Sequence, residues 1–346
     1  MKFSNFLFPE SKPPAGDYDV IEESLREAEL SEKLGYDVIW LAEHHFDGGC
    51  AYVDPTTFAA AIAARTTKIK IGFAVAQMAL HHPIRFAEQI ALVDNISKGR
   101  MVVGVGRGTA YNFYEFRGFG IDPNEAHDML LEVEDILVKS WTTNNYKHDG
   151  KYWQLELPVL RPQVFQKPHP PMIRACSGLE STLEMAREGR PFMMNVQSDQ
   201  TTVKRLRQYQ TTMSEAGHSD ETVAQSMADS WVWRNIFVAD TDAEAEKLGI
   251  PYFREMRAYL QTNRDKMNTT AELQAQATGA VGAARNSLEH GVIVGSPETV
   301  SERLQAVNDS GVGGVIIHFR LGAMPYDLNS HSMKLFAEQV MPNFKG

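Results

Sequence analysis

The chain has 346 residues, of which 43% are hydrophobic, enough for a large core in one or two domains. Its 34 lysines and arginines against 44 aspartates and glutamates give a net charge of −10, so neither nucleic acid nor an anionic membrane surface is expected as a partner. No apolar run reaches the roughly 20 residues of a membrane helix, and two cysteines, Cys50 and Cys176, provide no disulfide framework, so we expect a cytoplasmic protein.

Strand-like and helix-like segments alternate through the first part of the chain. Short apolar runs predict strands at residues 2–8, 37–41, 69–76 and 100–105. Apolar residues at helical spacing predict helices at 19–34, 55–65, 83–96 and 125–141. Four strand–helix units in succession indicate a parallel sheet.

Residues 142–171 interrupt this alternation, and their Asp149-Gly150 turn signal followed by prolines predicts a β-hairpin insertion after the fourth unit. Further strands are predicted at 171–175, 192–196, 231–239 and 311–319. Further helices are predicted at 179–187, 201–216, from 241 onward, and at 330–340. About eight strands and eight helices predict a single (β/α)8 TIM barrel over residues 1–346, in preference to an open doubly wound sheet.

Residues 256–290 form a polar stretch with several glycines and alanines. Long connections of this kind often serve as lids, so we interpret the stretch as a candidate mobile lid in the C-terminal half. A pair of surface helices is the alternative, and the sequence leaves both open.

Glu43, His44 and His45 end an apolar run abruptly, at the carboxyl end of the second predicted strand. Active sites of (β/α)8 barrels lie at these strand ends, and histidine titrates near neutral pH, so His44 is a candidate acid-base group. Adjacent side chains on an extended segment point in opposite directions, so we expect no metal ion here, although His81 and His82 follow the next strand. The alternative is that the histidines only form hydrogen bonds within a loop.

Arg107 lies among closely spaced glycines directly after the predicted strand at 100–105. A dinucleotide-binding turn would open a helix at this point, but residues 110–120 look like an aromatic-rich loop, so that interpretation fails. Arg107 is instead placed to pair with an anion, and the alternative is a surface ion pair.

Ser177 and Ser181 lie where another predicted strand leads into a helix. The free amides of a helix N-terminus and two hydroxyl groups could bind a phosphate. Helix capping by Ser177 is the simpler alternative, and the two roles are compatible.

Several blocks of this sequence, in matching order, resemble the bacterial luciferase-like family of flavin-dependent monooxygenases. The resemblance spans nearly the whole chain. It is carried by MKFSNFL at 1–7, WLAEHHF at 40–46, IGFAV at 71–75, HP at 82–83, DNISKGR at 94–100, GVGRG at 104–108, GSPE at 295–298 and MKLFAEQVMP at 333–342.

The resemblance implies a monooxygenase that receives reduced FMN from a separate flavin reductase and reacts it with O2 to a flavin hydroperoxide. One oxygen atom would enter a small apolar organic substrate, an aldehyde or a ketone. The alternatives are a deazaflavin-dependent hydride-transfer oxidoreductase of the same barrel family and a flavin-binding protein without turnover. Light emission is not implied, because Gly106 stands where luciferase has a cysteine.

The same resemblance implies roles for individual residues. His44 would serve catalysis, Glu43 would lie near the flavin, and a cis peptide between Ala74 and Val75 would face the isoalloxazine. The FMN phosphate would be held by Arg107, Ser177 and Ser181. The lid would be residues 256–290, and helices 55–65 and 83–96 would form the interface of a homodimer. Residues expected to line an apolar substrate cavity are Phe6, Phe8, Phe46, Tyr111, Phe113, Phe192 and Met194, although core packing would explain them equally well.

Overall fold

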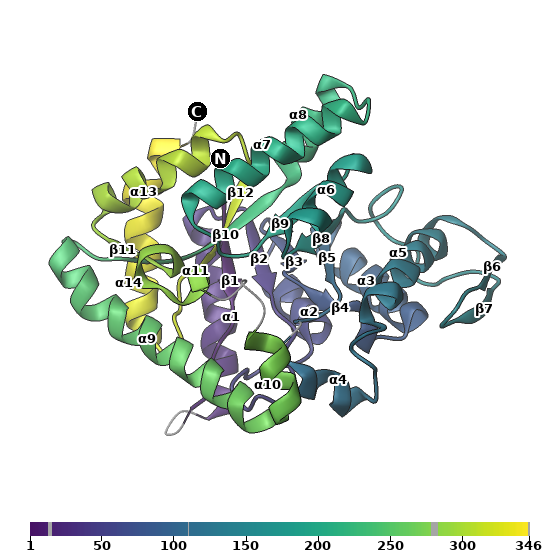
Figure 1. Cartoon of the computed structure of the whole chain (residues 1–346), viewed down its shortest axis with the longest axis horizontal. Helices are drawn as coiled ribbons and strands as arrows, with labels where there is room; N and C mark the ends of the chain where they lie inside the picture. The colour runs from purple at the N-terminus through teal and green to yellow at the C-terminus, as the bar shows by residue number, and fades with distance from the viewer. Residues whose placement is uncertain (13–15, 110, 278–282, 345–346) are drawn as a thin grey trace.

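Eight parallel strands form a closed ring in the computed structural model, which describes residues 1–12, 16–109, 111–277 and 283–344 (Figure 1). In order around the ring, the strands are β1 (Lys2–Leu7), β2 (Val38–Leu41), β3 (Lys70–Phe73), β5 (Met101–Gly106), β8 (Met172–Cys176), β9 (Phe192–Met194), β10 (Trp231–Val238) and β12 (Gly314–His318). Parallel pairing of β12 with β1 and of β9 with β10 closes the ring. The predicted (β/α)8 TIM barrel is therefore confirmed.

Helices that follow the strands cover the outside of the ring (Figure 1). They are α1 (Asp17–Leu34), α2 (Pro55–Arg65), α3 (Pro83–Ser97), α5 (Ala126–Thr142), α6 (Leu179–Arg187), α7 (Asp199–Glu215), α8 (Asp220–Asp229), α9 (Asp242–Met267), α13 (Pro297–Asp309) and α14 (Tyr326–Leu335). Proline at the first position opens α2 and α3, and the Asp54 carboxylate accepts a hydrogen bond from the Thr56 amide at 2.9 Å. Proline thus marks where both helices begin, and α2 also has a side-chain cap.

Two apolar layers hold the barrel together, because successive residues of a strand point to opposite faces. Inside the ring, side chains such as Trp40, Trp231 and Ile316 pack against one another. A larger layer lies between the ring and the helices. The ring is tight at Gly104, where an added Cβ would lie 1.6 Å from the carbonyl oxygen of Phe73.

The structure differs from the sequence-based expectation at residues 110–120, where a loop was predicted. Helix α4 (Phe113–Phe119) occupies this segment and ends at Gly120, whose φ of 70° is left-handed. Phe116 is buried against the start of α5, at Ala126 and Met129. The loop prediction was wrong because a helix of two turns is too short to show a periodic apolar pattern.

The strand predicted at 69–76 is divided into two pieces. Strand β3 ends at Phe73, and the short strand β4 (Ala76–Gln77) pairs with β5. Between them, the peptide bond from Ala74 to Val75 is cis, as the family resemblance implied. The remaining short elements are η1 (Met78–Leu80), β11 (Ile293–Gly295), η3 (Phe336–Val340) and η4 (Met341–Phe344).

Residues 142–171 contain an antiparallel pair of strands, β6 (Tyr146–Asp149) and β7 (Gln154–Leu157). Figure 1 shows this pair at the periphery, away from the central ring. The pair is joined to α5 through the Glu132 carboxylate, which lies 3.0 Å from His148 Nε2.

The segment predicted as a lid, residues 256–290, is mostly helical in the part that the structure describes. It comprises the end of α9, α10 (Thr270–Ala277), α11 (Ala283–Asn286) and α12 (Leu288–Gly291), while residues 278–282 lie outside the described residues. Polar contacts join it to the barrel: Asn263 donates to the Asp47 carbonyl at 2.8 Å, and Asn268 donates to the Tyr111 carbonyl at 2.7 Å. Movement of this segment stays a prediction.

Candidate active site

A cavity that is partly open to solvent lies at the carboxyl ends of the barrel strands. It is lined by Phe6, Phe8, His44, Asp47, Asn112, Tyr114, Trp233, Asn235, Met256, Arg257, Leu260, Asn263, Arg264, Arg285 and His318. Of the apolar residues predicted to line a cavity, Phe6 and Phe8 do so. Phe192 and Met194 instead face outward into the layer beneath the helices, because Met193 takes the inward position between them.

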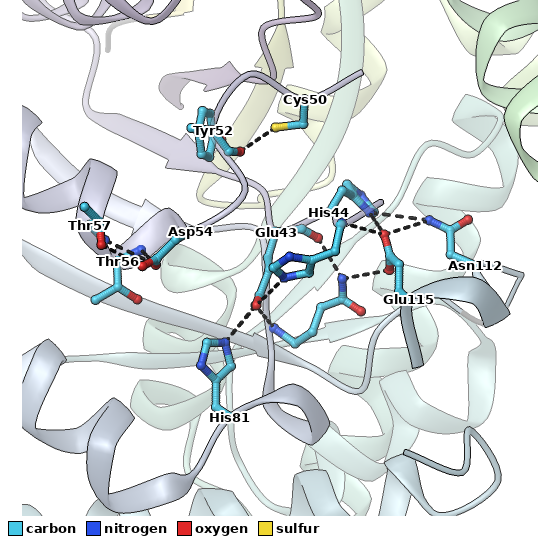
Figure 2. A network of polar contacts seen from close by, with 12 residues as sticks. Glu43, His44, Cys50, Tyr52, Asp54, Thr56, Thr57, His81, Asn112 and Glu115 are labelled. Atoms are coloured by element: carbon cyan, nitrogen blue, oxygen red, sulfur yellow. Dashed lines mark hydrogen bonds and ion pairs between the residues drawn. The ribbon is translucent and has the colours of Figure 1, made fainter. Parts of the chain in front are cut away.

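His44 lines this cavity and is held from behind by a buried carboxylate. Its Nδ1 lies 2.9 Å from Oε1 of Glu115, whose side chain is fully buried (Figure 2). Burial would lower the pKa of His44, but the charge of Glu115 and the hydrogen bond to it raise that pKa above its usual value. The ring is therefore fixed in orientation and protonates readily, as a proton donor at a reaction site requires.

Glu115 is itself held ionised by several donors. Gln77 donates to its Oε2 at 2.9 Å, and the backbone amide of His45 donates to its Oε1 at 3.2 Å. Burial alone would raise the pKa of Glu115, but His44 and these hydrogen bonds lower it. An ion pair between Glu115 and His44 thus lies at the cavity wall.

Glu43 does not line the cavity but lies behind it as the centre of a second network. His45 Nε2 and His81 Nε2 lie 3.0 and 2.9 Å from its carboxylate, and the backbone amide of Gln77 donates to it at 2.6 Å. Figure 2 shows Glu43 and His81 pointing toward each other. Burial would raise the pKa of Glu43, but the two histidines and this amide lower it to about 2. The Glu43 carboxylate therefore holds the backbone at Gln77, two residues after the cis peptide.

Gln77 connects the two networks, because its side-chain amide donates to both the Glu43 carbonyl oxygen and the Glu115 carboxylate. Adjacent His44 and His45 serve different carboxylates, as expected for neighbours on an extended segment. Within the described residues, no group of three or more His, Cys, Asp and Glu side chains is arranged to hold a metal ion.

Arg107 and the start of α6 lie next to each other, because β5 and β8 are paired neighbours in the ring. Arg107 is exposed and forms no ion pair with any residue that the structure describes. The N-cap of α6 is Gly178, which has no side chain to cap the helix, so the capping role considered for Ser177 is wrong. Ser181 donates its hydroxyl to the Gly178 carbonyl at 3.1 Å. The backbone amides at the start of α6 therefore have no side-chain cap, and Arg107 follows the neighbouring strand β5.

Arg205 of α7 adds a second guanidinium to this place, since its Nη1 donates to the Ser177 carbonyl at 3.3 Å. Burial lowers the pKa of Arg205. An anion bound beside Ser177 would therefore lie near the Arg205 guanidinium. The Ala74–Val75 peptide lies close by, because Val75 fills the space in which a side chain at Gly106 would sit, with its Cγ2 2.6 Å from the point where a Cβ on that glycine would lie.

Several residues of the site could not be found from the sequence alone. Glu115 is 71 residues away from His44, within the segment expected to be a loop. A lone carboxylate among aromatic residues was the only available signal. Gln77, Asn112 and the arginines of α9 likewise reach the site through long-range packing.

Known proteins share this architecture. Residues 1–314 match the model of the family described as luciferase-like monooxygenase. The chain is 24% identical to the alkanal monooxygenase alpha chain of the Kryptophanaron alfredi symbiont, over 100% of this chain and 99% of the relative. It is also 26% identical to the monooxygenase RslO1 from Streptomyces bottropensis, whose crystal structure superposes with a TM-score of 0.83 over 100% of both chains.

A second solved structure has the same fold and contains FMN. It is the oxygenating constituent of 3,6-diketocamphane monooxygenase, a type II Baeyer-Villiger monooxygenase from the CAM plasmid of Pseudomonas putida, in complex with FMN. The identity is 21% and the TM-score 0.80, over 100% of this chain and 99% of that one. Separately, no helix in the described part of the chain is long and apolar enough to cross a membrane.

Proposed function

The chain belongs to the luciferase-like monooxygenase family, and from this premise we propose that it uses reduced FMN and O2 to insert one oxygen atom into an organic substrate. The observation that carries the proposal is the His44–Glu115 pair at the wall of the cavity. It supplies a proton donor of fixed orientation where barrel enzymes perform their chemistry.

The residues present suit FMN. Arg107, Arg205 and the uncapped start of α6 would hold its phosphate, with Ser177 and Ser181 beside them. The Ala74–Val75 segment would lie against the flavin ring, with Glu43 fixing the backbone behind it. When bound, reduced FMN supplies the electrons that activate O2, which no side chain could provide.

The protein's own contribution is then orientation, proton delivery and exclusion of water. His44 would donate a proton from Nε2, because Nδ1 is engaged by Glu115. Aromatic side chains of the cavity, Phe6, Phe8 and Trp233, would keep bulk water from the reacting atoms.

We further propose that the reduced flavin comes from a separate reductase and that the chain acts as a homodimer in the cytoplasm. The first part is supported by the FMN-containing neighbour, which is named as the oxygenating constituent of its monooxygenase. The second is supported by exposed apolar side chains on α3, Leu92 and Ile96. An apolar aldehyde or ketone is the substrate class that the family resemblance favours.

Anaerobic titration with reduced FMN and, in parallel, with reduced deazaflavin tests the cofactor. We expect reduced FMN to bind and the deazaflavin not to bind. After mixing with air, protein-bound FMN should return to its oxidised absorbance more slowly than free FMN. Tight deazaflavin binding without oxygen consumption would instead identify a hydride-transfer enzyme, and flavin binding without any change in its oxygen reactivity would identify a binding protein without turnover.

A further inference from the structure

Three arginines from the lid segment meet at the active-site cavity: Arg257 and Arg264 from α9, and Arg285 from α11. We call them the arginine cluster. Arg257 Nε donates to the Asn286 side-chain oxygen at 2.8 Å, and Arg264 Nε donates to the Asn112 side-chain oxygen at 3.0 Å. Both guanidinium groups are thus held in place by neutral amides.

The charge of the arginine cluster is only partly balanced by acidic side chains. None of its members forms an ion pair with a residue that the structure describes; Asp47 is the one carboxylate among the side chains lining the cavity, and the Glu115 carboxylate behind Asn112 also acts on Arg264. Burial and repulsion from Arg285 and Arg264 lower the pKa of Arg257 to about 9. Positive charges crowded into a partly buried cavity are stabilised by an anion that enters it.

Another part of the cavity lining is aromatic, and Arg285 lies 5.6 Å from the Trp233 ring centroid, so the arginines and the aromatic residues adjoin. Phe6 lies 4.3 Å from Trp233 and 6.2 Å from Phe8, measured between ring centroids, and we call these three residues the aromatic wall. His318 packs edge-on against it, and burial lowers the pKa of His318 to about 3, so its ring is neutral. Nε2 of this buried histidine has no partner among the described residues. The wall suits an apolar body, and His318 adds an unused polar atom beside it.

The arginine cluster lies close to the acid-base pair. Asn112 accepts from Arg264 and also donates to Glu115 Oε1 at 3.3 Å, while Glu115 contacts His44. A group bound by Arg264 would therefore lie near His44, so a compact molecule could contact both residues.

We infer that the cavity binds a compact organic carboxylate, with its charged group on the arginine cluster and its apolar body on the aromatic wall. This inference rests on the proposed monooxygenase function and changes its substrate class from a neutral apolar molecule to an anionic one. Guanidinium groups bind carboxylates through paired, charge-assisted hydrogen bonds, whereas a neutral aldehyde would leave the cluster's charge uncompensated.

A flavin phosphate is the other anion that the arginine cluster could bind. A separate place for it exists at Arg107, Arg205 and the start of α6, on the β5 and β8 side of the ring. The cluster comes instead from α9 and α11, and it lines the cavity together with Trp233 and Asn235 of β10 and His318 of β12, although Arg264 also contacts Asn112 in the segment after β5. The two anion sites therefore come from different elements and can be altered separately.

The test is calorimetric titration of the protein, with and without FMN, using phenylacetate and hexanoate and their uncharged amides, phenylacetamide and hexanamide. We expect at least one acid to bind about tenfold or more tightly than its amide. Arg257→Gln and Arg285→Gln should each weaken acid binding by at least about tenfold, the effect of losing one charge-assisted hydrogen bond. Their FMN affinity should be unchanged. Arg254→Gln, an exposed arginine on the same helix, is the matched control and should change neither.

Equal binding of acids and amides, or no binding by either acid, would overturn the inference. Weaker FMN binding in Arg257→Gln and Arg285→Gln, without acid selectivity, would assign the cluster to the flavin and overturn it too. Failure of the proposed function gives a different result: the acids still bind selectively, but reduced FMN does not bind or does not react with O2.

Discussion

The contact between His44 and Glu115 is where the proposed chemistry depends on a single side chain. His44→Ala removes the proton donor but leaves the phosphate-binding residues in place. We expect FMN binding to persist while product formation is lost and hydrogen peroxide is released, since O2 is still consumed. Peroxide and product are measured after mixing with reduced FMN, and His127→Ala, an exposed histidine on α5, is the control. Unchanged coupling in His44→Ala would remove His44 from the mechanism.

Glu115→Gln tests how the carboxylate acts through His44. The Glu115 charge raises the pKa of His44, so a neutral amide of the same shape should lower that pKa and shift the high-pH limit of product formation to lower pH. The His44 pKa can be followed from its ring proton shifts in NMR. An unchanged His44 pKa, with activity merely reduced, would indicate that Glu115 only shapes the site.

The same pair makes stability depend on pH. Its contribution is fully present above the unfolded pKa of glutamate, about 4.3, and below that of histidine, about 6.5. It is lost as pH falls through the lowered pKa of Glu115, and also as pH rises through the raised pKa of His44. The stability difference between wild type and Glu115→Gln, measured by urea unfolding, should therefore be largest between about pH 4.3 and about pH 6.5.

At the level of elements, the segments that follow β5 and β8 are proposed to hold the flavin phosphate. Arg107→Ala should weaken FMN binding by roughly 1.5–3 kcal/mol, or about tenfold to hundredfold, because a charge-assisted pair is lost. Fluorescence titration of FMN measures the effect. Arg207→Ala changes an exposed arginine two residues beyond Arg205 and should have no effect. Equal affinities for all three proteins would place the phosphate elsewhere.

The packing of β5 against β3 depends on a residue without a side chain. Gly104→Ala would place a Cβ 1.6 Å from the Phe73 carbonyl oxygen, a backbone atom that cannot rotate away. We expect a loss of about 1–3 kcal/mol or more in the free energy of unfolding, measured with urea. Gly178→Ala is the control. The Cβ of an alanine there would meet open space, and the backbone φ of −112° at this position is one that alanine readily adopts. Similar losses in both variants would contradict the packing argument.

Strands and long helices could be predicted from the sequence because each carries a local pattern, an apolar run or helical spacing bounded by proline and glycine. Glu43 and His44 were found for the same reason, as polar groups at the end of an apolar strand. Glu115 and the arginine cluster were not, because 71 residues separate Glu115 from His44 and 152 separate Arg264 from Asn112. No local pattern records contacts over such distances.

For the whole molecule, the proposed homodimer makes a direct prediction. Leu92 and Ile96 are one helical turn apart on α3, and 53% and 41% of their surfaces are exposed. Leu92→Glu should convert the dimer to a monomer, because an isologous interface would bring two new charges together. Light scattering after size-exclusion chromatography measures the mass. Tyr18→Glu, on α1, is the control, and a monomeric wild type would refute the dimer.

Closure of the barrel by β1 and β12 also determines when this protein can fold. Lys2 pairs with Gly314, so β1 leaves the ribosome long before its second neighbour exists. At roughly 5–20 residues per second, synthesis of the intervening chain takes on the order of 15–60 s. During that time β1 carries an unpaired edge, which is prone to aggregation. Yield of soluble protein should therefore depend on temperature and chaperones during expression more than on the stability of the finished barrel.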